Sequence, residues 1–285
     1  MRNLGLTALC FVLLGACAGK PTPADIVDTE RAFAADGYER GVKASFLKYS
    51  ADDAVMLQPG PVNVHEAFLK TPDPDPNAPH RHLVWWPLWA GVARSGDLGF
   101  TTGPYGIDDN RIGHYFTVWK KQADGSWKWV FDSGVDADPS SEAGPDAKVD
   151  YLPLATARAA SPDSASMEVR NAEDELAAAA SDDLVSAYIR YLATDAHIHT
   201  EGPPPAKSQG EYESALKARA AAMTFSPLGG GASKAGDLVW TYGEARWNAD
   251  GADRQGYYVR VWQNRRDGWR IVFDELKPSP SDAKD

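Results

Sequence analysis

The sequence predicts an α+β fold that occurs twice along one chain. Apolar residues with helical spacing open each half, and strand-like runs close each half. The two halves repeat the same motifs in the same order, and 285 residues suffice for two hydrophobic cores. We therefore expect two α+β domains, over residues 24–138 and 166–278.

The evidence for duplication is a set of motifs at nearly constant spacing. Residues 96–103 match 236–243 at five of eight positions, and residues 127–132 match 269–274 at four of six. The same order and spacing hold for all the motifs, which indicates two homologous domains. Between them, the Pro-, Ala-, Ser- and Asp-rich segment 139–165 is predicted to be a linker.

The first repeat opens with predicted helices. Residues 24–35 have apolar positions at helical spacing, and Gly37 is expected to interrupt this helix. A second helix is expected to end near residue 48. A short strand over 54–58 and another helix over 65–70 follow.

The second repeat has the same plan with longer helices. An alanine-rich helix is predicted over 168–180, and residues 181–183 supply an N-cap for a helix over 184–192. A strand over 196–200 and a helix over 209–223 come next.

The remainder of each repeat is predicted to be antiparallel sheet. In the first repeat the strand-like runs are 83–94, 98–105, 112–121 and 127–135. Asp-Gly turns at 124–125 and 267–268 predict that the last two strands of each repeat form a hairpin.

The charge balance argues against some classes of partner. The chain has 29 Lys and Arg against 40 Asp and Glu, which gives a formal net charge of −11. Binding to nucleic acid, or to anionic lipid through charge alone, requires a basic face. We expect neither.

The N-terminus has the pattern of a secretion signal. Arg2 is followed by a mostly apolar run over 4–16, which is too short to span a bilayer as a helix. Residues 14–17, Leu-Gly-Ala-Cys, resemble the bacterial lipobox, in which the cysteine is lipidated after the signal is removed. The alternative is an ordinary secretory signal with a chance cysteine. The resemblance implies a signal peptide over 1–16 and lipidation of Cys17.

Lipidation of Cys17 has consequences for location and chemistry. By resemblance to Gram-negative lipoproteins, Ala18 in place of Asp favours a periplasmic protein anchored in the outer membrane. Cys10 would leave with the signal, so a disulfide, a cysteine nucleophile and a cysteine-rich zinc site are not expected. Residues 17–23 would be a tether, and 279–285 a C-terminal tail.

Four motifs of the first repeat resemble a known superfamily. They are DDAVML (52–57), SGDLGFTTGPY (95–105), GHYFTVW (113–119) and DGSWKWVFD (124–132). They are similar to the SnoaL-like, nuclear transport factor 2-like (NTF2-like) superfamily, and most similar to the domain of unknown function 4440 family. The resemblance implies a curved antiparallel sheet wrapped around N-terminal helices, which forms a cone with a pocket. Because relatives include isomerases, cyclases, dehydratases, binders and dimerisation modules, the fold alone does not select a function.

One strand of the second repeat carries three candidate catalytic residues. Asp195, His197 and His199 alternate, so they share one face of the predicted strand. If that face lines the cone, the trio could perform acid–base chemistry or hold a metal. The alternative is a polar strand with hydrogen-bonded histidines. Two histidines at i and i+2 supply only two ligands, so we expect no metal and no cofactor.

Other polar and aromatic residues are candidates for the wall of a pocket, each with an alternative role in a turn or in the core. They are Asp53, His114, Trp85, Trp240, Tyr242 and Tyr257. In the last strand of the first repeat, Trp127 and Trp129 are expected in the core. Asp132, and its counterpart Asp274, would then lie on the opposite face. This repeated carboxylate is expected to anchor the sheet by hydrogen bonds; the alternative is a functional acid.

The function that fits these observations is binding. The protein is expected to bind a small apolar or aromatic molecule, or to act as an interaction module at the membrane. The first alternative is a cofactor-independent isomerase or hydrolyase with acid–base chemistry in the second domain; the second is a structural scaffold with both cones filled. The resemblance also implies that the two domains pair through their sheets.

Overall fold

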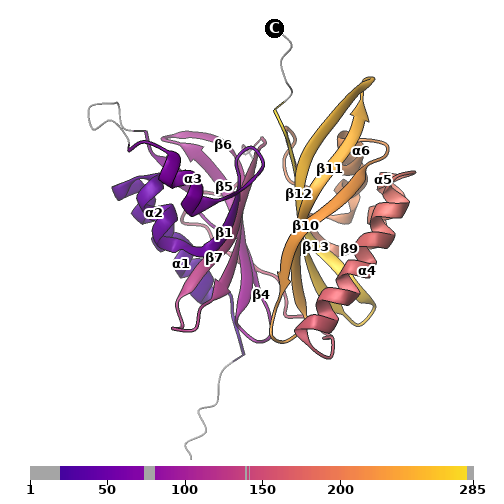
Figure 1. Ribbon diagram of the computed structural model, residues 1–285, viewed down its shortest axis with the longest axis horizontal. Coiled ribbons are helices and arrows are strands. Elements are labelled where there is room, and N and C mark those ends of the chain that lie inside the picture. Colours follow the sequence, from indigo (N-terminus) through magenta and orange to yellow (C-terminus); the bar gives the residue numbers. More distant parts are fainter. Residues whose placement is uncertain (1–19, 74–80, 139, 141, 281–285) are drawn as a thin grey trace, which may run out of the picture.

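The computed structural model describes residues 20–73, 81–138, 140 and 142–280. Two curved sheets face each other at its centre, with three helices outside the first and three outside the second (Figure 1). The prediction of an α+β class is confirmed. The expected signal peptide, Cys17 and residues 281–285 of the tail lie outside the described residues. No helix in the described part of the chain has the length and apolar character needed to cross a membrane.

The first half leads from two helices into its sheet. Its elements are α1 (Ala24–Arg40), α2 (Val42–Tyr49), β1 (Ser50–Leu57), β2 (Pro61–Asn63), α3 (Val64–Lys70), β3 (Leu83–Trp85), β4 (Trp89–Val92), β5 (Leu98–Ile107), β6 (Asn110–Lys121), β7 (Trp127–Asp136) and β8 (Asp150–Tyr151). The strand order is β2-β1-β7-β6-β5-β4-β8, and β3 also pairs with β5. β1 and β7 are parallel, and β5, β6 and β7 form an antiparallel meander.

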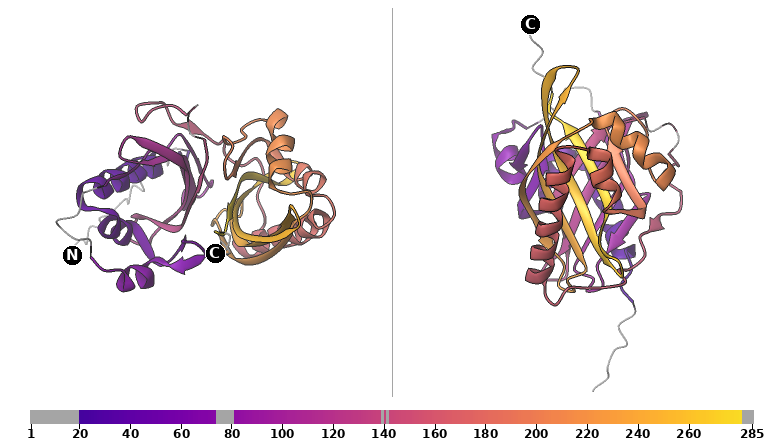
Figure 2. Two further views of the ribbon diagram at one scale, coloured as in Figure 1. Left: turned by 90° about the horizontal axis from the view of Figure 1, so that it is seen from above. Right: turned by 90° about the vertical axis from the view of Figure 1, so that its right-hand side faces the viewer.

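The second half repeats this topology. Its elements are α4 (Pro162–Ala180), α5 (Leu184–Ile189), β9 (Leu192–Thr200), α6 (Gln209–Arg219), β10 (Thr224–Ala232), β11 (Leu238–Ala249), β12 (Ala252–Arg265) and β13 (Gly268–Pro278). The strand order is β10-β11-β12-β13-β9, and β9 is parallel to β13 as β1 is to β7. Seen from above, each sheet curls around its own helices (Figure 2).

Two predicted boundaries in the first half are wrong for identifiable reasons. Helix α1 continues through Gly37 and ends before Gly41, whose φ of 85° favours glycine. Gly37 is needed for packing, because a Cβ there would lie 2.9 Å from the ring of Trp85. The predicted strand 83–94 is split into β3 and β4 around Pro87, which has no N–H for the ladder.

A β-bulge in the last strand of each half changes which residues face the helices. In β7, Trp129 and Phe131 pair with consecutive residues of β6, so Val130 is an extra residue. Trp129 therefore packs with the helices, Phe131 packs toward the second sheet, and Asp132 returns to the helix side. The prediction that Asp132 lies opposite the tryptophans is wrong, because one extra residue inverts the alternation. The equivalent bulge in β13 does the same for Asp274.

The segment predicted to be a linker makes contacts with both halves. Within 139–165, β8 pairs with β4, and Leu152 and Ala155 are buried. The amides of Ala157 and Ala159 donate to carbonyl groups of the second half. The described part of this segment is therefore held against both sheets, and the division of the chain at this point stays a prediction.

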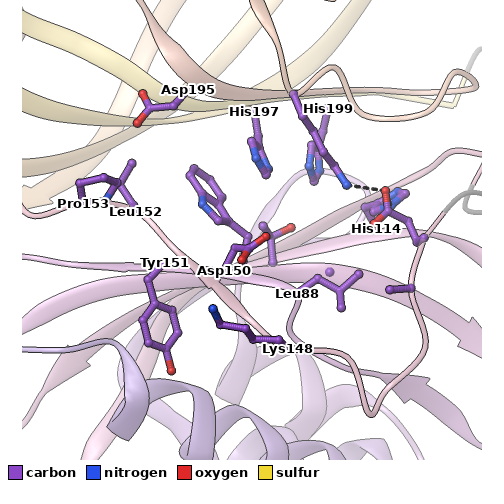
Figure 3. Close-up of a pocket in the computed structure, with 16 residues that line it drawn as sticks. Leu88, His114, Lys148, Asp150, Tyr151, Leu152, Pro153, Asp195, His197 and His199 are labelled. Atoms are coloured by element: carbon purple, nitrogen blue, oxygen red, sulfur yellow. Dashed lines mark hydrogen bonds and ion pairs between the residues drawn. The ribbon is translucent and has the colours of Figure 1, made fainter.

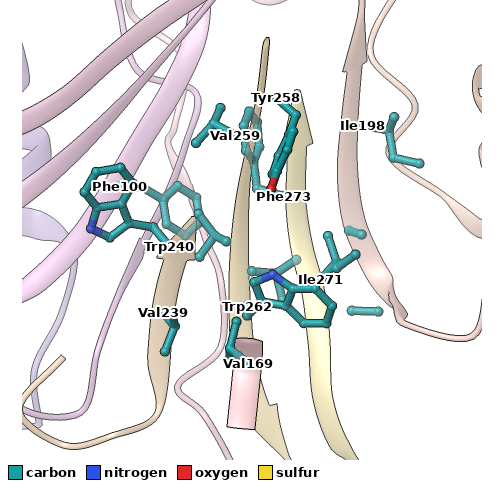
Figure 4. Close-up of a cluster of buried hydrophobic side chains, with 14 of the residues drawn as sticks. Phe100, Val169, Ile198, Val239, Trp240, Tyr258, Val259, Trp262, Ile271 and Phe273 are labelled. Atoms are coloured by element: carbon teal, nitrogen blue, oxygen red, sulfur yellow. The ribbon is translucent and has the colours of Figure 1, made fainter. Parts of the chain in front are cut away.

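Aromatic side chains fill the space between the two sheets. The rings of Phe116 and Phe273 stack with centroids 3.8 Å apart and an interplanar angle of 9°. Phe131 packs against Trp240 and Tyr242 at 5.3 and 5.2 Å. Figure 4 shows Phe100 and Trp240 on the side of this cluster that faces the first sheet. The two halves thus share one continuous apolar core.

Polar contacts across this interface follow an approximate two-fold relation. The amide of Arg94 donates to Asp237 at 3.0 Å, and the amide of Lys234 donates to Asp97 at 3.1 Å. These pairs occupy equivalent positions of the two repeats, as do Ser133 and Glu275, whose side chains hydrogen-bond at 2.5 Å. Because both partners of each contact come from matching positions, the interface is self-complementary like that of a symmetric dimer.

Candidate functional site

A buried carboxylate joins the first helix of each repeat to its sheet. Glu30 faces the sheet from α1 and accepts hydrogen bonds from the indole N–H groups of Trp85 at 2.6 Å and Trp119 at 3.0 Å. The hydroxyl of Thr101 donates at 2.5 Å to the same oxygen as Trp119, whereas Trp85 donates to the other oxygen. Burial raises the pKa of Glu30 to about 7, although these hydrogen bonds act to lower it. Glu30 is thus a fully hydrogen-bonded anchor.

A cavity of about 330 Å³ lies between the helices and the sheet of the first half. Most of its wall is apolar or aromatic, and it comes from Phe33, Val42, Phe46, Met56, Leu57, Phe68, Leu83 and Trp85. The remaining residues are Gln58, Tyr105, Tyr115, Asp132, Ser133, Gly134 and Lys277. This composition, an apolar wall with a few polar groups, is typical of a site for a small organic ligand.

Asp132 is the acidic residue of this cavity. It accepts a hydrogen bond from the Thr117 hydroxyl at 2.8 Å and has no cationic hydrogen-bond partner among the described residues. Burial raises its pKa to about 8, and the hydrogen bond from Thr117 only partly offsets this. At neutral pH the carboxyl group is mostly protonated, so it can donate a hydrogen bond to a ligand oxygen.

Two tyrosines lie near Asp132 in the wall. The Tyr115 hydroxyl is buried and donates to none of the described residues, and burial raises its pKa well above the ordinary value. The Tyr105 hydroxyl donates to Asp136. A buried hydroxyl without a partner costs free energy, so a ligand oxygen that accepts from Tyr115 would be stabilised.

In the second half, two buried arginines form ion pairs with the counterparts of Glu30 and Asp132. Arg260 occupies the position of Thr117 and contacts both Glu173, the counterpart of Glu30, and Asp274, the counterpart of Asp132. Arg219 pairs with the other oxygen of Asp274. Burial acts to raise the pKa of Asp274, but the two guanidinium groups outweigh it and lower the pKa.

The predicted catalytic trio lies elsewhere than expected. Asp195, His197 and His199 are on the face of β9 that is turned toward the first sheet, as the stacking of His197 on Trp89 at 3.8 Å shows. This face of β9 therefore does not line the interior between the helices and the sheet of the second half, as acid–base catalysis there would require. The three residues line a cavity of about 510 Å³ between the two halves, together with His114 (Figure 3).

The geometry of this interdomain cavity separates the acid from the imidazoles. The Asp195 carboxylate pairs with Arg265 at 2.8 Å, whereas the rings of His199 and His114 are neighbours with centroids 5.3 Å apart. Burial lowers the pKa of His197 to about 3, and that of His199 well below its ordinary range. Both imidazoles are neutral at physiological pH.

Charged groups at the rim of the interdomain cavity pair with one another. Lys207 contacts Glu142 at 2.5 Å, and Nε2 of His114 lies 3.5 Å from the same carboxylate, which is long for a hydrogen bond. The interaction with His114, followed by Lys207, lowers the pKa of Glu142 to about 2. Within the described ranges, no group of three or more His, Cys, Asp or Glu residues is arranged to hold a metal ion.

The other predicted pocket residues are distributed over several places. Trp85 lines the cavity of the first half, whereas Asp53 is exposed on β1. Trp240 and Tyr242 stack on each other and pack on the first half. Tyr257 lies against Gly60, where a Cβ would be 2.8 Å from its hydroxyl oxygen. The structure thus places these three aromatic residues in contact with the first half.

Sequence reasoning missed the groups that shape the two interiors. Glu30, Trp119 and their counterparts Glu173 and Trp262 recur with the spacing of the repeat, and this recurrence of a carboxylate and an indole was a usable signal. No such signal identifies Lys277, because its position has no charged counterpart in the first repeat.

Comparison with known proteins gives likeness of fold only. No protein-family model and no curated protein matches the chain. Among solved structures, an NTF2-like protein of unknown function from Shewanella oneidensis is 12% identical, with a TM-score of 0.34, over 39% of this chain and 97% of its own. An NTF2-like protein of unknown function from Pseudomonas putida is 15% identical over 44% and 92%, with a TM-score of 0.35. A protein from Kribbella flavida is 20% identical over 41% and 93%, with a TM-score of 0.33.

Proposed function

We propose that this protein binds a small, mostly apolar molecule in the cavity of its first domain, which has an NTF2-like fold. The observation that carries the proposal is the cavity of about 330 Å³, whose apolar wall ends at Asp132 and Tyr115. An apolar body would bind to the aromatic wall through the hydrophobic effect, and a ligand oxygen would accept hydrogen bonds from the two hydroxyl groups.

The proposal is tested by filling one cavity at a time. Leu83 lines the first-domain cavity and Leu88 lines the interdomain cavity, and both leucines are half-buried in the first half. With 2-naphthamide as a neutral aromatic probe, Leu83→Trp is expected to weaken binding at least about tenfold in calorimetric titration, because the indole occupies the site. Leu88→Trp adds the same volume and is expected to leave the affinity unchanged.

The pH dependence of the same titration distinguishes this cavity from a nonspecific apolar surface. Asp132 donates to the probe only when protonated, so the affinity should be nearly constant below about pH 7 and fall as the pH rises through about 8. Asp132→Asn keeps the shape and cannot ionise, so its affinity should stay constant. A probe that binds wild type and Leu83→Trp equally would contradict the proposal.

We also propose that the protein is anchored in the outer membrane, on the periplasmic side, by a lipid on Cys17. The support is the lipobox-like sequence Leu-Gly-Ala-Cys at 14–17 and the residue Ala18 that follows it. Cys17→Ser should move the protein from the membrane to the soluble fraction, whereas Cys10→Ser should not. Equal membrane retention of Cys17→Ser and wild type would disprove the anchor.

A further inference from the structure

One residue of the second half takes part in the cavity of the first. Of the described residues that line this cavity, all but one belong to the first half, and the exception is Lys277 near the end of β13. Lys277 alternates with Phe273 and Glu275, which both contact the first half, so the strand directs it across the interface.

Lys277 retains capacity for a further partner. Its ammonium group donates one hydrogen bond, to the carbonyl oxygen of Gly134 at 2.9 Å, and the residue is half-buried. An ammonium has three donors, so two remain. Among the described residues Lys277 forms no ion pair, whereas Lys207 in the other cavity is paired with Glu142.

The acidic groups around Lys277 do not neutralise it at mildly acidic pH. Glu275 accepts a hydrogen bond from Ser133, and burial raises its pKa to about 7. Burial likewise raises the pKa of Asp132 to about 8. At pH 6 both carboxyl groups are mostly protonated, so Lys277 is the main charge among the described residues that line the cavity.

We propose that the ligand of the first-domain cavity is a small amphipathic carboxylate. Its carboxylate group would bind Lys277 and accept hydrogen bonds from Asp132 and Tyr115, while its apolar body lies among the aromatic residues of the wall. A carboxylate fits because the wall of this cavity includes an ammonium and two hydroxyl donors, those of Tyr115 and of protonated Asp132. The inference rests on the proposed binding function and adds that the second domain supplies the charge that selects the ligand.

The test compares two probes of nearly the same shape. Calorimetric titration of the full-length protein at pH 6 with 2-naphthoate and with the neutral 2-naphthamide should show at least about tenfold tighter binding of the carboxylate. Lys277→Met removes the charge and keeps most of the stem, so it should abolish this preference without weakening the amide. Lys277→Arg should retain the preference, and Lys207→Met is the matched lysine control.

Each outcome has a separate meaning. Equal affinity for the two probes in wild type, or a carboxylate preference that survives in Lys277→Met, would overturn the inference and leave the proposed binding function in place. Binding of neither probe would overturn both. If Lys277→Met does not fold, as judged by its melting curve, a preference lost in Lys277→Gln and kept in Lys277→Arg supports the inference. A preference kept in both overturns it.

Discussion

Arg260→Thr is expected to lower the free energy of unfolding, measured on the second half, by about 3–5 kcal/mol. Arg260 is fully buried and pairs with Glu173 and Asp274. Its removal leaves Glu173 without a cation in the interior, and Asp274 keeps only Arg219. The cost of burying an unpaired charge dominates this loss. Threonine is the residue at the equivalent position of the first repeat and suits a strand, so backbone strain should contribute little.

The matched control is Arg246→Thr on the neighbouring strand β11. Arg246 is exposed and its ion pair with Glu244 is open to solvent, so the change should cost less than about 1 kcal/mol. Chemical denaturation followed by tryptophan fluorescence would measure both variants. If Arg260→Thr lowers the free energy of unfolding no more than Arg246→Thr does, the buried ion pairs contribute little to the stability of the second half.

Phe273→Ala is expected to destabilise both halves together, by about 3–5 kcal/mol. Phe273 is fully buried and stacks on Phe116 of the first half, so its truncation opens a void in the shared core. Amide hydrogen exchange should therefore accelerate in β5 and β6 of the first half as well as in β12 and β13 of the second.

Ile271→Ala is the control for Phe273→Ala. Ile271 is also fully buried, but it lies beside Trp262 on the other side of the bulge, toward helix α4 (Figure 4). Its truncation should accelerate exchange in the second half and leave β5 and β6 unchanged. If Phe273→Ala leaves exchange in β5 and β6 unchanged, the two halves are not energetically coupled through this ring.

The repeat and the α+β class could be predicted because they depend on local patterns. Residues 96–103 and 236–243 keep their turn and strand residues, and the Asp-Gly turn at 124–125 joins β6 to β7 as the sequence indicates. Such signals act over a few residues, so they need no knowledge of tertiary contacts.

The orientation of side chains was harder to predict because strand alternation depends on an unbroken register. Asp132 was expected on the face opposite Trp129, yet both face the helices, because Val130 is bulged out of the ladder. Nothing in the six residues from 127 to 132 marks the bulge; it arises where β7 must pair with β1 and β6 at once. The orientation of His197 was equally hard to predict. Its side chain stacks on Trp89 of the first half, and the local sequence does not show which face of β9 packs against that half.

The sequence alone determined the helices, most strands, the recurrence of the motifs and the acidic charge of this protein, since these follow from local spacing and composition. Only the tertiary structure decided that Asp132 has no cationic hydrogen-bond partner among the described residues, whereas its counterpart Asp274 pairs with two arginines. The difference arises because Arg260 of the second half occupies the position that Thr117 has in the first. Its guanidinium group pairs with Glu173 of α4 and Asp274 of β13. The tertiary structure also decided that Lys277 lines the cavity of the first half. Its contact with Gly134 joins residues more than a hundred positions apart, so it depends on how the two sheets pack.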